Sequence, residues 1–259
     1  MTVPLGATLA AHRDAGRKLF IPYVMAGSTP TWLDAVEALI AAGADAVEVG
    51  LPFSDPIIDG PTIQAAATIA LHAGTTFDGV VAALSTRRLG VPLIAMTYAN
   101  VVLSRGYDLA AHLLFGAGCS GAIIADLSLE ELDDWHDAAD THGIETVLLA
   151  APSTPPARLD AICARAQGFL YAVGRMATTG ETASLDPRGI ELVRALRPRT
   201  SLPICLGIGI SSPAQAAEAC AVADGVVVGS AIVRRMLEGE SPEALGAFAG
   251  SLREGLDAQ

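Results

Sequence analysis

Basic residues and long apolar runs are scarce in this sequence of 259 residues, and each scarcity excludes a class of function. Only 16 residues are Lys or Arg against 28 Asp or Glu, which gives a formal net charge of −12. Nucleic acids and anionic membranes bind basic surfaces, so neither is expected as a partner. No apolar run approaches the ~18 to 20 residues that span a bilayer. The N-terminus also lacks the basic and apolar segments of a secretory signal, so we expect a cytoplasmic location.

Cysteine is scarce as well. The chain has four cysteines and no CxxC pair: Cys119, Cys163, Cys205 and Cys220. In a cytoplasmic chain such cysteines are typically small buried residues. We therefore expect neither a disulfide set nor a cysteine-ligated metal site.

Short β-rich apolar runs alternate with helical patterns along the chain. Strands are predicted near Leu19–Met25, Ala46–Gly50, Pro92–Tyr98, Gly121–Ala125, Thr146–Ala150, Phe169–Val173, Pro203–Leu206 and Gly225–Val228. Amphipathic or alanine-rich patterns predict helices at Trp32–Ala42, Phe77–Arg88, Glu130–His142, Pro156–Ala166, Pro213–Val222 and Pro242–Leu256. Three segments, AAGADAVEVG, GAGCSGAIIAD and AVADGVVVGS, repeat the passage from a helix end through a turn into a strand, as a repeated βα unit requires.

Eight strands, each followed by a helix, predict an α/β fold of the (β/α)8 type, a TIM barrel with extra helices. The chain is close to the ~250 residues typical of this fold, so we expect residues 1–259 to form a single barrel domain. The alternative is a doubly wound open sheet. That fold usually carries GxGxxG after its first strand, whereas here the first strand ends in VMAGST. The barrel is the better prediction.

Three carboxylates occur without a cation in VEVGLPFSDPIIDG, residues 47–60. Alternation along a barrel strand points Glu48 into the barrel, near the carboxyl end of the second strand, where barrel enzymes place catalytic groups. The alternative, an internal salt bridge, has no Lys or Arg on the neighbouring strands to form it. Asp59 lies on the loop above, before a helix that Pro61 can start. Asp59 and Asp55 are each ordinary turn residues, but Glu48 and Asp59 together form a candidate acid–base site.

The positions of the lysine and the histidines argue against several types of catalytic site. The single lysine, Lys18, precedes the first strand and therefore belongs to the end of the barrel opposite the active face, which argues against a Schiff-base aldolase. All five histidines fall in predicted helices or at their ends: His12, His72, His112, His136 and His142. A histidine-ligated metal site is therefore not expected. A site like that of triosephosphate isomerase would need a rim lysine and histidine, so carboxylate acid–base chemistry remains.

Two glycine-bearing loops predict a phosphate site. LGIGISSP follows the seventh strand, and VVGSAIV follows the eighth and opens a short helix. In barrel enzymes these two loops often bind phosphate. Gly209, Gly229 and the backbone of Ser230 can approach an anion closely, and the helix N-terminus adds free N–H groups and its positive dipole end.

These features together resemble the tryptophan synthase alpha chain family over nearly the whole length. The most specific match is VEVGLPFSDPIIDGPTIQ, and MTYAN, GIGISSP and VGSAIV follow in order and spacing. The resemblance implies a carbon–carbon lyase that cleaves indole-3-glycerol phosphate to indole and glyceraldehyde 3-phosphate by a retro-aldol reaction. It implies no metal and no cofactor in this chain. It also implies a separate beta chain as partner, in a heterotetramer that makes L-tryptophan.

The resemblance assigns roles to particular residues. It implies that Glu48 is the general acid–base and that Asp59 accepts the indole N–H. Tyr171 matches a tyrosine near the catalytic glutamate, and Tyr98 matches one near the indole. Asp55 matches a residue that reaches the beta chain. The phosphate ligands that it implies are Gly180, Gly209, Gly229 and Ser230.

The chain departs from the family in its lid and at two surface positions. GRMATTGETAS, after the sixth strand, matches a mobile lid whose threonine, here Thr179, closes onto Asp59. MAT stands where the family has Ser-Gly-Val before Thr179 and Gly180, and the missing glycine restricts the backbone. Ser128 replaces a proline, and Ile69 stands where arginine is common, both in regions that face the beta chain.

These departures leave three alternatives to an alpha chain working with a beta chain. One is a stand-alone indole-3-glycerol phosphate lyase of specialised metabolism, which the altered lid and interface would suit. Another is a catalytically weak homologue kept as a regulatory or scaffolding subunit, although the retained acids and phosphate loops argue against it. The third is a different phosphosugar enzyme on the same barrel.

Overall fold

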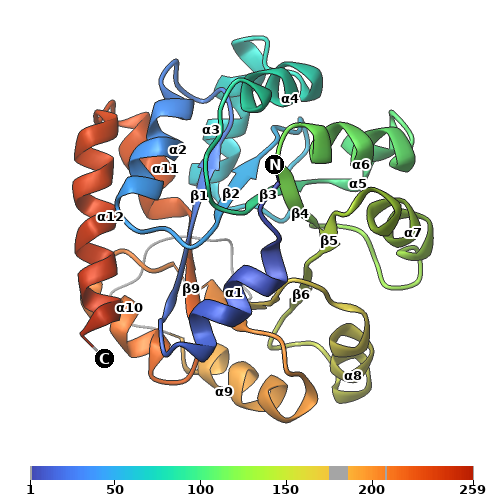
Figure 1. The fold of residues 1–259 in the computed structure, drawn as a ribbon, viewed down its shortest axis with the longest axis vertical. Coiled ribbons are helices and arrows are strands. Elements are labelled where there is room, and N and C mark those ends of the chain that lie inside the picture. Colours follow the sequence, from blue (N-terminus) through green and yellow to red (C-terminus); the bar gives the residue numbers. More distant parts are fainter. Residues whose placement is uncertain (1, 175–185, 208, 259) are drawn as a thin grey trace.

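Parallel strands form one sheet at the centre of the molecule (Figure 1). The computed structural model describes residues 2–174, 186–207 and 209–258. The strands are β1 (Leu19–Met25), β2 (Val47–Gly50), β3 (Leu93–Thr97), β4 (Cys119–Ile124), β5 (Glu145–Thr146), β6 (Leu148–Ala150), β7 (Leu170–Val173), β8 (Ile204–Gly207) and β9 (Gly225–Val228). Their order in the sheet is β5-β4-β3-β2-β1-β9-β8-β7-β6.

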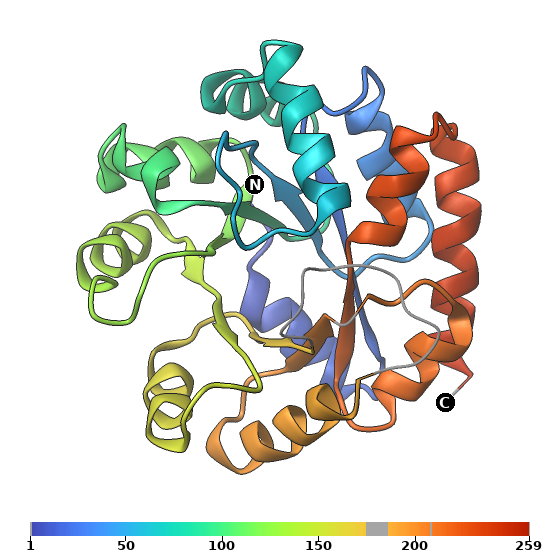
Figure 2. The ribbon, with the colours of Figure 1, turned by 180° about the vertical axis from the view of Figure 1, so that it is seen from behind.

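The two ends of this sheet are joined by the chain itself. Only Val147 separates β5 from β6, and its N–H donates to the carbonyl oxygen of Ala122 at 3.0 Å. β5 pairs with β4, and β6 pairs with β7. Residues 145–150 therefore act as one strand with a neighbour on each side, and the predicted barrel is confirmed, with its helices around the outside (Figure 2).

The helices for which the sequence predicted bounds begin and end close to those positions. The described helices are α1 (Leu5–Asp14), α2 (Trp32–Ala41), α3 (Pro61–His72), α4 (Phe77–Ser85), α5 (Ala99–Leu103), α6 (Tyr107–Gly116), α7 (Asp133–His142), α8 (Pro156–Arg165), α9 (Pro187–Leu196), α10 (Pro213–Cys220), α11 (Ser230–Leu237) and α12 (Pro242–Asp257), with a 3-10 turn at Arg197–Arg199. Proline opens several of them, because its fixed φ suits the first turn. α7 starts three residues later than predicted, since Ser128 and Glu131 form a turn before it.

Alternation along the strands separates two apolar clusters, as predicted for β2. Val47 and Val49 pack in the larger cluster between the strands and the outer helices. Ala46 packs in the smaller cluster inside the barrel, with Leu19 and Ile21 of β1. Glu48, between the two valines, therefore points into the barrel, where water is excluded.

Helix α1, which the sequence reasoning did not predict, closes the amino end of the barrel. It crosses the ends of the strands in Figure 1 and buries Leu5 and Leu9 completely in the interior cluster. Gly121 and Gly168 leave room for it, because a Cβ on either would lie 2.5 to 2.7 Å from a methyl carbon of Leu5. The interior is therefore filled from below, and a ligand can enter only from the carboxyl ends of the strands.

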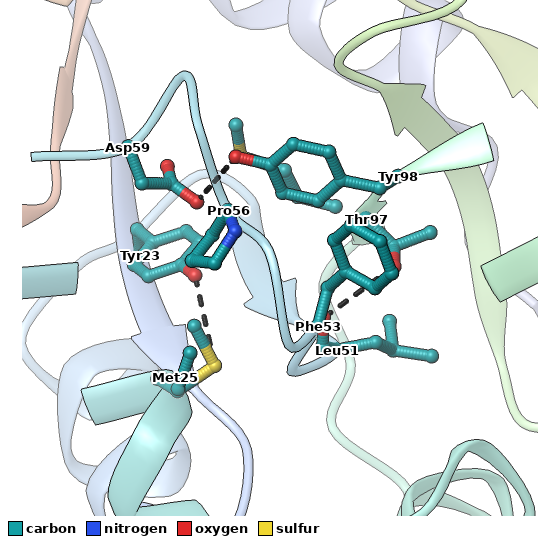
Figure 3. Close-up of a pocket in the computed structure, with 10 residues that line it drawn as sticks. Tyr23, Met25, Leu51, Phe53, Pro56, Asp59, Thr97 and Tyr98 are labelled. Carbon is teal, nitrogen blue, oxygen red and sulfur yellow. Dashed lines mark hydrogen bonds between the residues drawn. The ribbon is translucent and has the colours of Figure 1, made fainter. Parts of the chain in front are cut away.

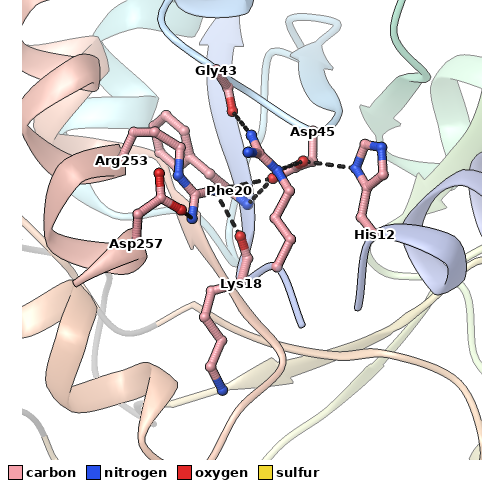
Figure 4. Close-up of polar contacts among 8 residues, drawn as sticks. His12, Lys18, Phe20, Gly43, Asp45, Arg253 and Asp257 are labelled. Atoms are coloured by element: carbon pink, nitrogen blue, oxygen red, sulfur yellow. Dashed lines mark hydrogen bonds and ion pairs between the residues drawn. The ribbon is translucent and has the colours of Figure 1, made fainter. Parts of the chain in front are cut away.

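A polar cluster around Asp45 ties α1, β1 and α12 together at this same end (Figure 4). Asp45 is 2% exposed and accepts hydrogen bonds from the Phe20 N–H at 2.8 Å and from Arg17 Nε at 2.6 Å. Its oxygens also lie 2.8 Å from His12 Nδ1 and 3.3 Å from Arg253. These donors satisfy the hydrogen-bonding capacity of the buried carboxylate, so its burial costs little.

Lysine and cysteine lie where the sequence predicted. Lys18 is at the amino end, where its Nζ donates to the carbonyl oxygen of Ala223 at 3.1 Å. All four cysteines are free thiols; Cys119, Cys205 and Cys220 are buried, and Cys163 is partly exposed. Within the described ranges no single helix is long and apolar enough to cross a membrane. α3 and α4 qualify only as a pair, by length and composition, and are bent by 89°.

We predict that Asp45→Asn lowers the free energy of unfolding by about 3 kcal/mol, because it removes the buried carboxylate that Arg17 and Arg253 share and leaves Arg253 only the half-exposed Asp257 as a counter-charge. Urea denaturation followed by circular dichroism measures the loss. Asp14→Asn is the matched control, since Asp14 pairs with Arg13 at the exposed surface and such pairs contribute little. Equal stability of the two variants would contradict a structural role for the Asp45 cluster.

Candidate functional site

A pocket opens at the carboxyl ends of β1, β2 and β3 (Figure 3). It lies under the loop that connects β2 to α3, and most of its wall is apolar. The lining residues are Tyr23, Met25, Leu51, Phe53, Pro56, Asp59, Ala67, Met96, Thr97 and Tyr98. An apolar wall with a few polar groups suits a flat, largely hydrophobic ligand.

Glu48 lies below this pocket without a positive partner. It is 1% exposed, and its Oε1 accepts no hydrogen bond from any described residue. None of the ion pairs among the described residues includes it, so the salt-bridge interpretation finds no support there. Burial raises the pKa of Glu48 from 4.5 to about 8. The carboxyl group therefore holds its proton at neutral pH and can act as an acid.

Two tyrosines lie near Glu48: Tyr23, which is buried and pairs with Glu48 in the register of β1 and β2, and Tyr171, which is partly buried. Burial raises the pKa of both hydroxyls well above the ordinary value of 10; Asp59 and then Glu48 add to the effect for Tyr23, and Glu48 and then Asp59 for Tyr171. Since each tyrosine responds to both acids, the four side chains share one electrostatic environment. The two acids that the sequence singled out are thus brought together.

Glycines make room for these tyrosines. A Cβ added at Gly50 would overlap the Tyr23 hydroxyl oxygen, and one added at Gly207 would overlap that of Tyr171. The floor of the site is therefore packed so closely that not even a methyl group fits at either glycine. With the tyrosine rings above it, Glu48 is almost completely shielded from bulk water.

Asp59 is held at the edge of the pocket by Tyr98. The Tyr98 hydroxyl donates to Asp59 Oδ2 at 2.9 Å, and the Tyr98 ring stacks on Phe53 with centroids 5.0 Å apart. Burial raises the pKa of Asp59, and the hydrogen bond from Tyr98 partly opposes that rise. The carboxylate is thus available as an acceptor facing an apolar pocket.

The predicted phosphate loops lie at the same end of the barrel. Gly229 is the N-cap of α11, whose first residue is Ser230, and a Cβ on Gly229 would lie 3.7 Å from the Cβ of Tyr23. Gly209, just after β8, has a φ of +72°, which glycine adopts without strain. The start of α11 therefore points its N–H groups toward the same end of the barrel as Glu48, as an anion site requires.

Three predicted residues are not among those that the structure places at the site. Thr179 and Gly180 fall in 175–185, outside the described residues. Asp55 is exposed on the outer part of the β2–α3 loop, where it accepts a hydrogen bond from Ser54 Oγ at 2.6 Å. It does not line the pocket.

Sequence reasoning missed Tyr23, Gly50 and Gly207. The signal for Tyr23 was present, because it continues the inward series of Leu19 and Ile21 on β1. The two glycines carry no signal of their own. Their importance depends on which side chain crosses above them, and only the assembled barrel determines that.

Known proteins were compared with the chain. The model of the family described as tryptophan synthase alpha chain matches residues 9–248. The chain is 41% identical to the tryptophan synthase alpha chain of Streptomyces coelicolor, over 98% of this chain and 97% of that protein. It is 43% identical to that of a Picosynechococcus species, over 94% and 96%.

Solved structures give the same result. A structure of Mycobacterium tuberculosis tryptophan synthase matches with a TM-score of 0.91 and 36% identity over 99% of both chains. The tryptophan synthase alpha subunit of Legionella pneumophila matches with a TM-score of 0.88 and 31% identity over 98% of both. The resemblance that the motifs indicated is thereby confirmed.

We predict that Glu48→Gln stabilises the protein increasingly as pH rises from 4.5 to about 8. In that window Glu48 is neutral when folded but ionised when unfolded, so wild-type stability falls with pH and then levels off. At about 1.4 kcal/mol for each pH unit, the window amounts to on the order of 4 to 5 kcal/mol. Urea denaturation at several pH values measures the difference. Glu37→Gln, at the exposed surface, is the control, and a pH-independent difference for Glu48→Gln would contradict the pKa shift.

We predict that Gly50→Ala destabilises the protein by about 2 kcal/mol, because the new methyl group forces Tyr23 aside. Adding Tyr23→Phe removes the overlapping hydroxyl and should recover about 1 kcal/mol, which a double-mutant cycle in urea measures. Gly250→Ala, in an open position on α12, is the control and should be neutral or stabilising. Strictly additive effects of the Gly50 and Tyr23 substitutions would show that the two residues do not meet.

Proposed function

The chain belongs to the tryptophan synthase alpha chain family, and we propose that it cleaves indole-3-glycerol phosphate to indole and glyceraldehyde 3-phosphate. Family membership makes the chain a lyase with the role of an alpha subunit in L-tryptophan biosynthesis. One observation carries the specific reaction: a buried carboxyl group that holds a proton at neutral pH lies with a second acid beneath an apolar pocket.

The first step protonates the indole ring. Glu48 enters with its proton and transfers it to indole C3, the carbon that bears the glycerol phosphate chain. The ring loses aromaticity, and positive charge develops at the ring N–H. The Asp59 carboxylate accepts a hydrogen bond from that N–H. It stabilises the charge more strongly in the transition state than in the ground state.

The second step breaks the carbon–carbon bond. The Glu48 carboxylate takes the proton of the glycerol hydroxyl next to the ring, and that oxygen forms the aldehyde carbonyl. The bonding electron pair returns to the ring, which becomes aromatic again as indole. Glu48 ends protonated, as it began, so one carboxyl group serves as acid and then as base.

The surrounding residues position the substrate. Tyr98 fixes the Asp59 carboxylate, and Tyr171 packs beside Glu48. The phosphate group binds at the glycine-bearing ends of β8 and β9, with Thr179 contributing a lid that closes onto Asp59. The proposed phosphate ligands are Gly180, Gly209, Gly229 and Ser230.

We propose a tryptophan synthase beta chain as partner, in the cytoplasm where such a pathway operates. Large apolar side chains are exposed around the loop that carries Asp55 and Asp59. They are Ile57, Ile58, Ile69 and Leu103, at 81%, 46%, 46% and 57% exposure. An apolar surface beside the active-site loop supports docking of a second protein chain there. The comparisons do not favour the stand-alone lyase, although the altered lid and interface positions would suit it.

We predict that the purified chain releases indole from indole-3-glycerol phosphate slowly, and faster with a beta chain. Without a beta chain, kcat/KM should fall as pH rises through about 8, because Glu48 loses the proton that starts the reaction. Glu48→Gln should lose at least about a hundredfold in rate. The measurement is indole formation in single-substrate assays between about pH 6 and 9, the range that brackets this pKa.

Three results would change the assignment. No indole in either condition would contradict the cleavage reaction. Fast release that a beta chain does not alter would indicate a stand-alone lyase. A rate that rises steadily above about pH 8 would mean that Glu48 starts the reaction as a base.

A further inference from the structure

Gln64 binds the main chain of the loop that carries Asp59. Its Nε2 donates to the Asp59 carbonyl oxygen at 2.9 Å and to the Pro56 carbonyl oxygen at 3.3 Å. Gln64 belongs to the first turn of α3, and that helix is anchored by the buried side chains of Ile63, Ala66, Ala67 and Ala70. The amide group therefore connects a fixed helix to the loop above the pocket.

The loop is a tight turn that needs such a connection. The Asp59 N–H donates to the Pro56 carbonyl oxygen at 3.1 Å, and the Ile57 N–H donates to the Asp55 carbonyl oxygen at 2.9 Å. Between these bonds, Ile57 and Ile58 are largely exposed and contribute little packing. Pro56 and Asp59, the two ends of the turn, are the residues that Gln64 binds.

Asp59 is thus held at two points. Tyr98 binds its carboxylate and Gln64 binds its carbonyl oxygen. The Tyr98 hydrogen bond fixes one oxygen, but the direction of the side chain also depends on the main chain from which it projects. A carboxylate that must meet a ring N–H within hydrogen-bond distance tolerates little displacement, since a shift of about 1 Å can cost a hundredfold in rate.

Glutamine fits this position chemically. Its NH2 group carries two donors, one for each carbonyl oxygen. Asparagine is one methylene shorter, and an ionised glutamate has no donor and would place a third negative oxygen beside two carbonyl oxygens.

We propose that Gln64 is a positioning residue for the cleavage reaction, which it serves by fixing the main chain of Asp59. This inference rests on the proposed function, because it assigns Gln64 an effect on the step in which Asp59 stabilises the charged ring. Removal of the amide should therefore lower kcat more than it raises KM, since the positive charge develops during the reaction and is absent from the bound substrate.

The test compares Gln64→Ala and Gln64→Glu with wild type in the full-length chain. For Gln64→Ala we expect kcat about tenfold lower and KM within about twofold. Thr68→Ala is the matched control, because the Thr68 hydroxyl donates to the Gln64 carbonyl oxygen one turn along the same helix. It perturbs α3 at Gln64 and leaves the amide in place, so its kcat should equal that of wild type.

Gln64→Glu adds a pH signature that a structural role would not produce. Above about pH 7 the new carboxylate repels both carbonyl oxygens, and its kcat relative to wild type should fall below that of Gln64→Ala. As the pH falls toward about 4.3, the ordinary pKa of glutamate, a growing fraction of the carboxyl groups is protonated and regains one donor. Its kcat relative to wild type should therefore rise toward and above that of Gln64→Ala as the pH is lowered.

A second readout does not depend on activity. The Asp59 amide proton is donated within the turn, so its hydrogen exchange reports how well the turn is held. We expect Gln64→Ala to speed this exchange at least about fivefold, while exchange in the buried strand β2 and in Thr68→Ala is unchanged.

The outcomes separate this proposal from the proposed function. A kcat for Gln64→Ala within about twofold of wild type, or Gln64→Glu following Gln64→Ala at every pH, would overturn it. Equal losses in Thr68→Ala would assign the effect to the helix and also overturn it. A wild-type chain that releases no indole contradicts the proposed cleavage instead, and the exchange rate at Asp59 then decides whether Gln64 holds the loop.

Discussion

The burial of an unpaired carboxyl group, Glu48, is the constraint on which the rest of the site depends. An acid in this position must hold its proton, because the ionised form has lost its hydration and gains no cation or donor in return. The features around it maintain that condition. Helix α1 seals the barrel from below, and Tyr23 and Tyr171 cover the carboxyl group beside the strands. A single arginine in this layer would lower the pKa and remove the acid.

The two ends of the barrel give their buried carboxyl groups, Asp45 and Glu48, opposite surroundings. At the amino end Asp45 receives Arg17, Arg253 and a backbone N–H, so its charge is stabilised and links three elements. Glu48 lies only three residues further along the chain. No cation in the described part of the chain pairs with it. Because no ion pair among the described residues includes Glu48, this carboxyl group keeps its proton, while the Asp45 cluster stabilises the opposite end of the fold.

The sequence predicted features that follow from local periodicity and not those that require assembly. Strand positions came within about two residues, because buried parallel strands give short apolar runs between turn residues, and alternation placed Glu48 correctly. Helix α1 was missed because only Leu5 and Leu9 are buried in it, and alanines on its exposed side make its pattern weakly amphipathic. Gly50 and Gln64 were missed for another reason: the side chain that crosses the first and the loop that binds the second come from contacts that no local pattern encodes.

The loop between β2 and α3 carries exposed apolar residues directly beside a residue of the pocket. Ile57 and Ile58 face solvent at its tip, and Asp59 follows directly, with its carboxylate in the pocket. A protein chain that buries the two isoleucines would restrict the same turn that Gln64 and Tyr98 hold from within. Ordering the turn would remove conformations in which Asp59 points away from the substrate ring, so docking and the proposed cleavage would be coupled through the chain itself. In an alpha subunit whose rate responds to its partner, the consecutive residues Ile57, Ile58 and Asp59 would be enough to connect the docking surface to the reacting ring.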